Sequence, residues 1–167
     1  KLIVNTKGTF TLKNCTFNPK TEGSIRTAVK LNVGEAVVKN NIFGGATNGY
    51  YNAIEFGINN DNDLKKAEII GNTFENNYFN FYNMTDDAVI DISNNSLLLA
   101  AKASNGIRIS NPRNAENVTF NITKDSYTYA NDSDESPFEG LILLQDYSQG
   151  NATQDFTNIN ININELS

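Results

Sequence analysis

The residues that could carry chemistry in this chain are mostly carboxylates in two short polar segments. Paired carboxylates act as acid and base, or as acid and nucleophile, when enzymes cleave glycosidic bonds. The candidates are Asp61, Asp63, Asp86, Asp87 and Asp91. Arg108 stands between Ile107 and Ile109, so a strand here would point it away from the core and towards such a site. Carbohydrate cleavage is therefore the first chemistry to consider.

A simpler interpretation also accounts for the charges. Lys30, Glu55 and Arg108 occupy equivalent places in three short alternating runs, so we expect them to share one outer sheet face. Opposite charges on neighbouring strands stabilise a solvated face without any catalytic role. The chain also has no His. We favour this interpretation and predict no catalytic residue.

Asp61, Asn62 and Asp63 offer hard oxygen ligands of the kind that calcium takes. The segment lacks the glycine and the distal glutamate of a complete EF-hand loop. An ordinary polar loop explains it, and the acidic segment at 132–135 is a weaker candidate still. We predict no metal ion and no cofactor.

Glycan binding through aromatic side chains is a further candidate activity. The tyrosines near expected loop–strand borders are Tyr50, Tyr51, Tyr78, Tyr82, Tyr127 and Tyr129. Such tyrosines more often form the edge of a core with the hydroxyl in water, and the chain has no Trp. A surface glycan therefore stays a candidate partner without an assigned site.

The composition narrows the class of protein. The 167 residues fit one domain with a substantial core, and Asn is the outlier with 29 residues. The net charge of −6, with no run of Lys or Arg, disfavours binding to nucleic acid or to an anionic membrane surface. No apolar stretch comes close to the length of about 18 residues that a membrane-spanning helix needs. The chain starts at Lys1, which we interpret as a processed or partial chain.

One heptapeptide pattern recurs and defines the architecture. It reads apolar, apolar, polar, Asn, Asn, any residue, Phe, and its clearest copy is residues 37–43. The other copies are residues 11–17, 68–74 and 91–97, and the single cysteine, Cys15, replaces the second Asn of the first copy. A repeat of about 20 to 50 residues built on short strands is typical of a solenoid.

A second series of short alternating runs lies between these copies. The runs contain Leu2, Val29, Ile54, Phe79, Ile107 and Leu141. Alternation of apolar and polar residues places one face of each strand in the core. Together the two series predict an all-β, right-handed parallel β-helix of about six coils, in one domain over residues 1–167. We expect Phe to stack on Phe and the recurring Asn to form a ladder at one turn.

Three local expectations complete this prediction. Residues 63–67 are expected to form one helical turn, and residues 97–103 a short helix on a corner. Residues 118–122 take the strand position of the fifth coil without an Asn pair. Residues 156–163 alternate strictly near their end, which predicts an edge strand with Ile inward and Asn outward.

With its interior apolar rows and its recurring Asn41, Asn72 and Asn95, the chain resembles the right-handed parallel β-helix proteins of the pectate-lyase-like superfamily. That group includes pectate-lyase-like and polygalacturonase-like enzymes and the β-helical proteins of phage virions. The resemblance implies the fold, but this fold hosts many unrelated functions. The clustered aspartates of the lyases and the motifs of the polygalacturonases are missing. With residues 51–57 followed after a loop by residues 67–72, the chain most resembles the non-catalytic β-helical virion proteins of tailed phages.

We expect a structural protein on the surface of a virion, as a capsid decoration, a fibre or part of a spike. It would act by contact with capsid or tail proteins, and a homotrimer is one assembly that fits this role. One alternative is a fragment of a polysaccharide lyase or glycoside hydrolase. A second alternative is a bacterial adhesin, secreted or held at the cell surface. The sequence favours a non-enzymatic role without deciding it.

Overall fold

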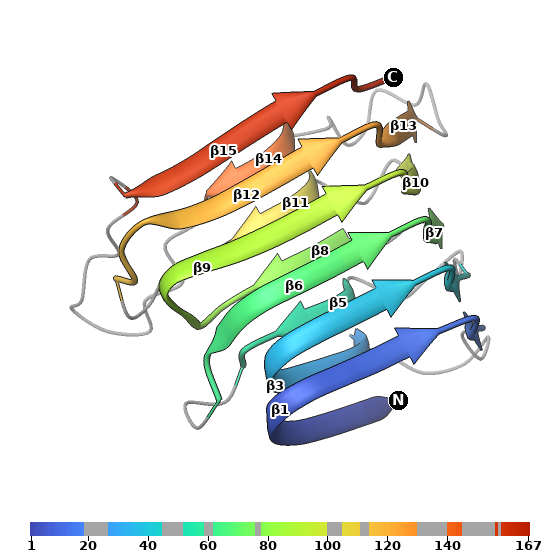
Figure 1. Ribbon diagram of the computed structural model, residues 1–167. Helices are drawn as coiled ribbons and strands as arrows, with labels where there is room; N and C mark the ends of the chain where they lie inside the picture. The colour runs from blue at the N-terminus through green and yellow to red at the C-terminus, as the bar shows by residue number, and fades with distance from the viewer. Residues whose placement is uncertain are drawn as a thin grey trace.

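The computed structural model of the chain is an all-β stack of parallel coils. It describes residues 1–18, 27–44, 52–58, 62–75, 78–99, 105–110, 114–129, 140–144, 156 and 158–167. Every element in these ranges is a β-strand, and Figure 1 shows successive strands rising one above another from the N-terminus to the C-terminus. Within the same ranges, no helix is long and apolar enough to cross a membrane.

The strands differ in length but follow one repeated path. They are β1 (Leu2–Lys13), β2 (Thr16–Phe17), β3 (Thr27–Lys39), β4 (Ile42–Phe43), β5 (Asn52–Phe56), β6 (Leu64–Ile70), β7 (Thr73–Glu75), β8 (Tyr78–Phe81), β9 (Met84–Ser93), β10 (Ser96–Leu99), β11 (Asn105–Ile109), β12 (Val118–Thr123), β13 (Ser126–Tyr129), β14 (Gly140–Leu144) and β15 (Ile159–Asn164). The long strands β1 and β3 curve through two sides of a coil (Figure 1). Later coils divide the same path between two strands, as in β5 and β6.

The strands form two parallel sheets. The larger sheet has the order β14-β11-β8-β5-β3-β6-β9-β12-β15, with β1 also paired to β3, and the smaller sheet has the order β13-β10-β7-β4-β2. β3 joins the two halves of the larger sheet, because its first part pairs with β5 and its second part with β6. We call one passage of the chain around the stack a level. The levels are β1–β2, β3–β4, β5–β7, β8–β10, β11–β13 and β14–β15.

The stack amounts to about 4 turns. Among the described residues, the first and last levels each have a neighbouring level on one side only. The prediction of about six coils was too high; among the described residues, the last level has no strand in the smaller sheet. The prediction of an all-β parallel solenoid is confirmed.

Inward-facing apolar side chains repeat at the same position of successive levels and form the core. One in-register row, entirely buried, consists of Val29, Ile54, Phe79 and Ile107. Along the smaller sheet, Phe43 stacks on Phe17 with ring centroids 5.0 Å apart and on Phe74 with centroids 4.9 Å apart. Burial of apolar surface contributes about 25 cal/mol per Å², so each continuous row stabilises all the levels that it crosses. The expected stacking of Phe on Phe is confirmed.

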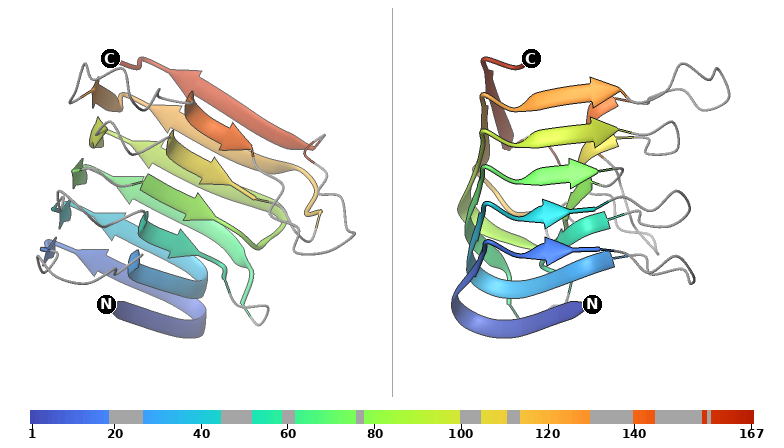
Figure 2. Two further views of the ribbon diagram at one scale, coloured as in Figure 1. Left: turned by 180° about the vertical axis from the view of Figure 1, so that it is seen from behind. Right: turned by 90° about the vertical axis from the view of Figure 1, so that its right-hand side faces the viewer.

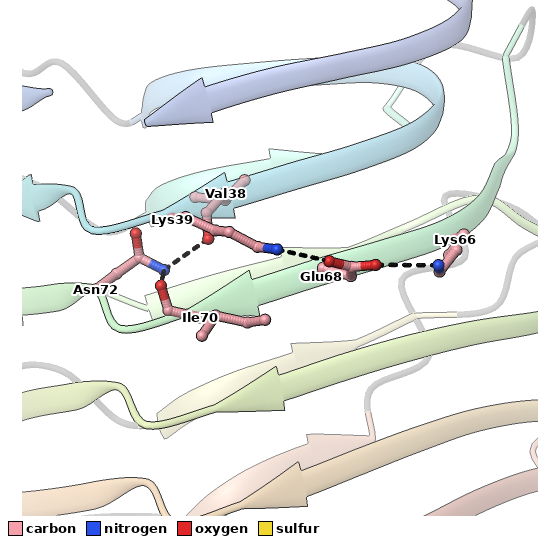
Figure 3. Close-up of polar contacts among 6 residues, drawn as sticks. All are labelled: Val38, Lys39, Lys66, Glu68, Ile70 and Asn72. Carbon is pink, nitrogen blue, oxygen red and sulfur yellow. Dashed lines mark hydrogen bonds and ion pairs between the residues drawn. The ribbon is translucent and has the colours of Figure 1, made fainter. Parts of the chain in front are cut away.

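An asparagine ladder follows the turn between the larger and the smaller sheet. The backbone N–H of Asn41 donates to Asn72 Oδ1 at 2.9 Å, and that of Asn72 donates to Asn95 Oδ1 at 2.9 Å. Asn72 Nδ2 also donates to the carbonyl oxygen of Val38 on the preceding level, at 2.9 Å (Figure 3). These buried amides therefore satisfy backbone groups that water cannot reach. The predicted ladder is confirmed, and Cys15 takes its first position by donating its backbone N–H to Asn41 Oδ1.

The residue before each ladder position adopts the left-handed backbone conformation. These residues are Asn14, Asn40, Gly71, Asn94, Lys124 and Glu165, with φ between 52° and 66°. Gly and Asn adopt this conformation at lower cost than other residues, which explains the recurrence of Asn directly before the ladder. The turn is therefore the same on every level that the structure describes.

Two helical expectations are wrong. Leu64–Ile70 forms β6, and Ser96–Leu99 forms β10, while residues 100–103 lie outside the described residues. Leu64, Ala67 and Ile69 are buried, and pairing of β6 with β3 and β9 overrides the local helical preference. The expectation for the last strand is confirmed in its main points: within the described part of the chain β15 pairs only with β12, its Asn side chains are exposed, and Ile159 and Ile161 pack against the core. Ile163, however, is 51% exposed.

Candidate functional site

A line of polar and charged side chains crosses the outer face of β3, β5, β8 and β11. We call it the polar row, and it consists of Lys30, Glu55, Asn80 and Arg108. The register places each of these residues beside the next, since the strands are parallel and Lys30 pairs with Glu55, Glu55 with Asn80, and Asn80 with Arg108. The prediction that Lys30, Glu55 and Arg108 share one outer face is therefore confirmed.

Burial distinguishes the polar row from an ordinary solvated face. Glu55 is 5% exposed and Asn80 is 0% exposed. Lys30 Nζ lies 2.7 Å from Glu55 Oε2, and Asn52 Nδ2 donates to Glu55 Oε1. Asn80 Nδ2 donates to the hydroxyl of Tyr82 at 2.9 Å. The interpretation of this face as solvated is wrong at Glu55 and Asn80, because both side chains are buried and bonded to protein groups.

The polar row can hold a charge but does not supply the pair of carboxylates that glycoside cleavage requires. Glu55 is its only acid, and an acid–base or acid–nucleophile pair needs two. Lys30 is the cation beside Glu55, so the two side chains neutralise each other within the row. Removing one partner of such a pair would leave the other charge buried without compensation and would destabilise the fold. The pair therefore also constrains the register of β3 and β5.

A second charged cluster lies on the outer face of the other half of the larger sheet. Glu68 on β6 is flanked by Lys39 Nζ at 2.8 Å and Lys66 Nζ at 3.0 Å, and Figure 3 shows the three side chains in one line. The hydrogen bond from Lys39, followed by that from Lys66, holds the pKa of the Glu68 carboxyl below its usual value. The hydrogen bond to Glu68 in turn raises the pKa of Lys66. The cluster links β3 to β6 across the sheet.

Asp91 continues this outer face on the next level, in register with Glu68. Its Oδ1 accepts a hydrogen bond from Asn121 Nδ2 at 2.8 Å, and Asn121 Oδ1 accepts one from Asn162 Nδ2 at 2.9 Å. Asp91 is thus the first member of a chain of amide hydrogen bonds through β9, β12 and β15. This arrangement gives it a structural partner on the adjacent level.

Asp86 and Asp87 are exposed residues near the start of β9. Asp86 Oδ1 accepts the backbone N–H of Glu116 at 2.9 Å, and Asp87 Oδ1 accepts Asn117 Nδ2 at 3.3 Å. Asp87 has φ 57°, a conformation that short polar side chains tolerate. Both carboxylates therefore bind the corner of the following level.

Asp86, Asp87 and Asp91, which all belong to β9, do not lie in the half of the larger sheet that carries Arg108. Arg108 lies on β11, in the half of the larger sheet opposite to β9, which carries Asp91. Asp61 and residues 132–135 lie outside the described residues. Asn62 Nδ2 donates to the backbone oxygen of Asn32 at 3.2 Å. Among the residues described, no group of three or more His, Cys, Asp or Glu side chains is placed to hold a metal ion.

The tyrosines are used within the fold where their side chains are described. The Tyr82 hydroxyl accepts from Asn80, and the Tyr127 hydroxyl donates to Asp125 Oδ2 at 3.3 Å. Tyr50 and Tyr51 lie outside the described residues, and for Tyr78 and Tyr129 only the strand positions are described.

Asp125 is a buried polar residue that the recurring pattern did not predict. It is 0% exposed and takes the ladder position after Asn95, whose backbone N–H and Nδ2 both donate to Asp125 Oδ1. Burial raises the pKa of the Asp125 carboxyl above its usual value, although the hydrogen bonds from Asn95 and Tyr127 act in the opposite direction. Burial also raises the pKa of the Tyr127 phenol, and the nearby Asp125 raises it further. Alignment of Ile122 to Tyr127 with the earlier heptapeptides would have revealed the position.

The fold and these rows define the class of the protein as a parallel β-solenoid with a ladder of buried amides. No family model, no curated protein and no solved structure matches the chain. The structure supports the expected β-helix fold. No relative links the chain to the pectate-lyase-like superfamily or to phage proteins.

Proposed function

We propose that this chain is a structural protein that acts by contact, as a component of a virion surface such as a capsid decoration, a fibre or part of a spike. One observation carries the proposal: several of the charged side chains described above bond to neighbours on adjacent levels. Lys30 pairs with Glu55, Lys39 pairs with Glu68, and Asp91 accepts from Asn121. Charges used in this way lock levels together, which suits a protein whose task is to keep its shape.

The mechanical character of the fold supports the same proposal. In a solenoid each repeat contacts only its neighbours, and stacking buries one continuous core. The Phe stack and the asparagine ladder run through several levels, so a force on one level is shared by the next. Figure 2 shows the levels in regular order along the stack. Such a body offers long side faces to partners in a capsid or tail.

The first test asks where the chain is found. Particles purified from the source culture are digested and analysed by quantitative mass spectrometry, with a capsid protein as the internal standard. We expect this chain at many copies per particle, in fixed ratio to the capsid protein. Its absence from purified particles would contradict the virion proposal.

The second test asks whether the chain cleaves polysaccharides. The isolated chain is incubated with acidic and neutral polysaccharides, and new reducing ends and unsaturated products are measured. We expect no product above that of a heat-denatured control. Product formation that is lost in Glu55→Gln or Asp61→Ala and kept in Asp91→Asn would overturn the structural proposal in favour of a lyase or hydrolase.

A further inference from the structure

Three side chains that can react with one another meet where β3 and β5 lie side by side. Glu55 binds two partners through its two carboxylate oxygens: Lys30 Nζ lies 2.7 Å from Oε2, and Asn52 Nδ2 donates to Oε1. One carboxylate therefore holds an amine and a carboxamide next to each other. A lysine amine beside a base is a nucleophile, and a carboxamide has an electrophilic carbon. The cluster thus contains both reactants of an amide-forming reaction and a base between them.

An irregularity in β5 brings Asn52 to Glu55. Side chains three residues apart on a regular strand point to opposite faces. The pairing of β5 with β8 shifts between Asn52 and Ile54, which marks a β-bulge. A bulge re-aims nearby side chains, and the hydrogen bond between Asn52 and Glu55 shows the result. Lys30 arrives from the neighbouring level, because it pairs with Glu55 in the register of β3 and β5.

Burial protects this cluster from water. Asn52 is 7% exposed and Glu55 is 5% exposed, while the side chain of Lys30 is 25% exposed. Exclusion of water strengthens electrostatic interactions and suppresses competing hydrolysis. Among the described residues, Asn52 Oδ1 has no hydrogen-bond partner, although buried polar side-chain atoms are nearly always bonded. A purely structural role for Asn52 does not account for this open acceptor.

We propose that Lys30 and Asn52 form an intramolecular isopeptide bond, with Glu55 as the catalytic residue. Glu55 takes a proton from the Lys30 ammonium and leaves a neutral amine. The amine attacks Asn52 Cγ, so that the bond between Nζ and Cγ forms and the bond between Cγ and Nδ2 breaks. Glu55 donates its proton to Nδ2, which leaves as ammonia.

The remaining proton restores the catalyst. The new amide nitrogen gives up one proton to Glu55, and the departing ammonia carries that proton away as ammonium. One ammonium and one carboxamide have then become one secondary amide and one ammonium ion, and Glu55 is again a carboxylate. The reaction needs no further reactant.

The register selects Asn52 over Asn80 as the reaction partner of Lys30. Asn80 lies on the other side of Glu55, because β5 stands between β3 and β8 in the sheet. Its Nδ2 donates to the hydroxyl of Tyr82 at 2.9 Å. Asn52, in contrast, shares the carboxylate with Lys30. The flexible four-carbon stem of Lys30 allows Nζ to approach Cγ to the distance of about 3–3.5 Å from which reaction proceeds.

The bond would close a covalent ring around one level of the solenoid. Between Lys30 and Asn52 the chain passes through the rest of β3 and through β4. Each repeat of a solenoid contacts only its neighbours, so levels can separate one at a time. A covalent link between equivalent strands of two successive levels prevents that separation. This inference does not rest on the proposed function, since an enzyme or an adhesin of this fold would gain the same link.

Mass spectrometry of the intact, folded chain tests the proposal. We expect a mass lower than that of the sequence by one molecule of ammonia. A chain kept in denaturant from extraction onwards should have the full mass and should lose ammonia after refolding, because the three groups meet only in the fold. Succinimide formation at an asparagine also releases ammonia, so a second measurement locates the bond.

Digestion with trypsin distinguishes the isopeptide bond from a succinimide. Trypsin cleaves after Lys and Arg, so an unlinked chain gives the separate peptides 27–30, 31–39 and 40–65. Lys30 resists cleavage once its amine has become an amide. We therefore expect peptide 27–39 joined to peptide 40–65 in one branched product, with fragment ions that assign the bond to Lys30 and Asn52. A succinimide would give linear peptides.

Substitutions test the role of each side chain. Lys30→Arg keeps a cation beside Glu55, but a guanidinium stays protonated and is no nucleophile, so the loss of ammonia should be abolished. Asn52→Ala removes the reacting carbon and should abolish it as well. Glu55→Gln cannot take the proton and should slow the reaction about 100-fold or more. Lys39→Arg is the matched control, because Lys39 also pairs with a glutamate, Glu68, and this variant should still lose ammonia.

Three results would overturn the inference. One is a folded, unaltered chain that keeps its full mass during prolonged incubation at neutral and alkaline pH. Another is a loss of ammonia that persists in Lys30→Arg or is found only in linear peptides, which would place the chemistry at a different asparagine. The third is a branched peptide that joins Lys30 to Asn80, which would show that the assigned partner is wrong. Circular dichroism of each variant verifies that its fold is retained.

Discussion

At the end of the asparagine ladder, two donors of Asn95 share one acceptor atom of Asp125. Asp125 Oδ1 accepts the backbone N–H of Asn95 at 2.8 Å and its Nδ2 at 3.1 Å. On earlier levels the acceptor is an amide oxygen, and the same amide donates through Nδ2 to a backbone carbonyl, as Asn95 does to Ile69 at 2.9 Å. An ionised carboxylate accepts hydrogen bonds but has none to donate. Asp125 therefore closes the ladder.

Asp125→Asn should stabilise the fold at neutral pH. Burial raises the pKa of the Asp125 carboxyl in the folded state, so ionising this group is less favourable in the fold than in the unfolded chain. The stability contributed by this group is fully present below its pKa in the unfolded chain and is lost as the pH rises through the raised pKa of the folded state. Asn is neutral throughout and also supplies a donor. We expect a gain of about 1 kcal/mol at pH 7 and little change at low pH.

Urea unfolding of the parent and of Asp125→Asn across a pH series measures this difference. Asp91→Asn is the matched control, because it removes a carboxylate from the outer face while keeping an acceptor for Asn121. A lower stability of Asp125→Asn at pH 7 would show that the ionised carboxylate is the favoured form in the fold.

Asn72→Ala should be one of the most destabilising changes in the chain. Asn72 Oδ1 accepts from the backbone N–H of Asn41 within the buried turn. Asn72 Nδ2 donates to the carbonyl oxygen of Val38 (Figure 3). Alanine would leave both backbone groups buried without these partners. Each unsatisfied buried group costs about 1–3 kcal/mol, so we expect a loss of about 3 kcal/mol in the free energy of unfolding.

Asn121→Ala is the control for Asn72→Ala, because it also removes an amide that bonds on two sides but at a less buried position. Asn121 also bonds on two sides, to Asp91 and Asn162, but it is only half-buried. Water can replace these partners, so the loss should stay below about 1 kcal/mol. Thermal or urea unfolding measures both variants, and equal losses would contradict the role assigned to the ladder.

The fold was predictable because stacked levels require similar residues at equivalent positions. The spacing of Phe17, Phe43 and Phe74 follows from the row that they form, and Asn41 and Asn72 recur because each supplies the backbone partner for its neighbour. The helical expectation at 63–67 failed for the same physical reason. Pairing with strands far away in sequence decides the conformation there, and a local pattern does not contain those strands.

The sequence predicted that the side chains of the polar row point outward, but it did not predict that Glu55 is buried. Alternation placed Lys30, Glu55 and Arg108 outward, and the register confirms it. Burial of Glu55 depends on contacts outside its own strand, such as that with Lys30, and a strand pattern does not report them. Asp125 was missed because Asp replaces the expected Asn, although the two side chains have nearly the same shape and share the acceptor role.

Lys124→Asn should stabilise the turn of the fifth level. Lys124 has φ 58°, whereas Asn14, Asn40 and Asn94 hold the equivalent position on other levels. The left-handed conformation costs a residue with a long side chain about 1–2 kcal/mol, and Asn tolerates it better. The contact of Lys124 Nζ with Glu165 Oε2 at 3.6 Å is exposed and contributes little. Thermal unfolding should show a gain of about 0.5–1 kcal/mol, with Lys65→Asn unchanged as the control; a lower melting temperature for Lys124→Asn would contradict it.

Glu68→Gln should reduce stability above the acidic range and have no effect below it. Lys39 and Lys66 lower the pKa of Glu68 in the folded state, so the stability that its carboxylate contributes is present above the unfolded pKa. That contribution is lost as the pH falls through the lowered pKa of the folded state. The group is partly exposed, so screening by solvent keeps the effect at about 0.5–1 kcal/mol. Unfolding at pH 7 in low and high salt measures it, because salt should shrink the difference between parent and variant. A difference that persists at a pH below the folded pKa would show that Glu68 acts through packing and not through charge.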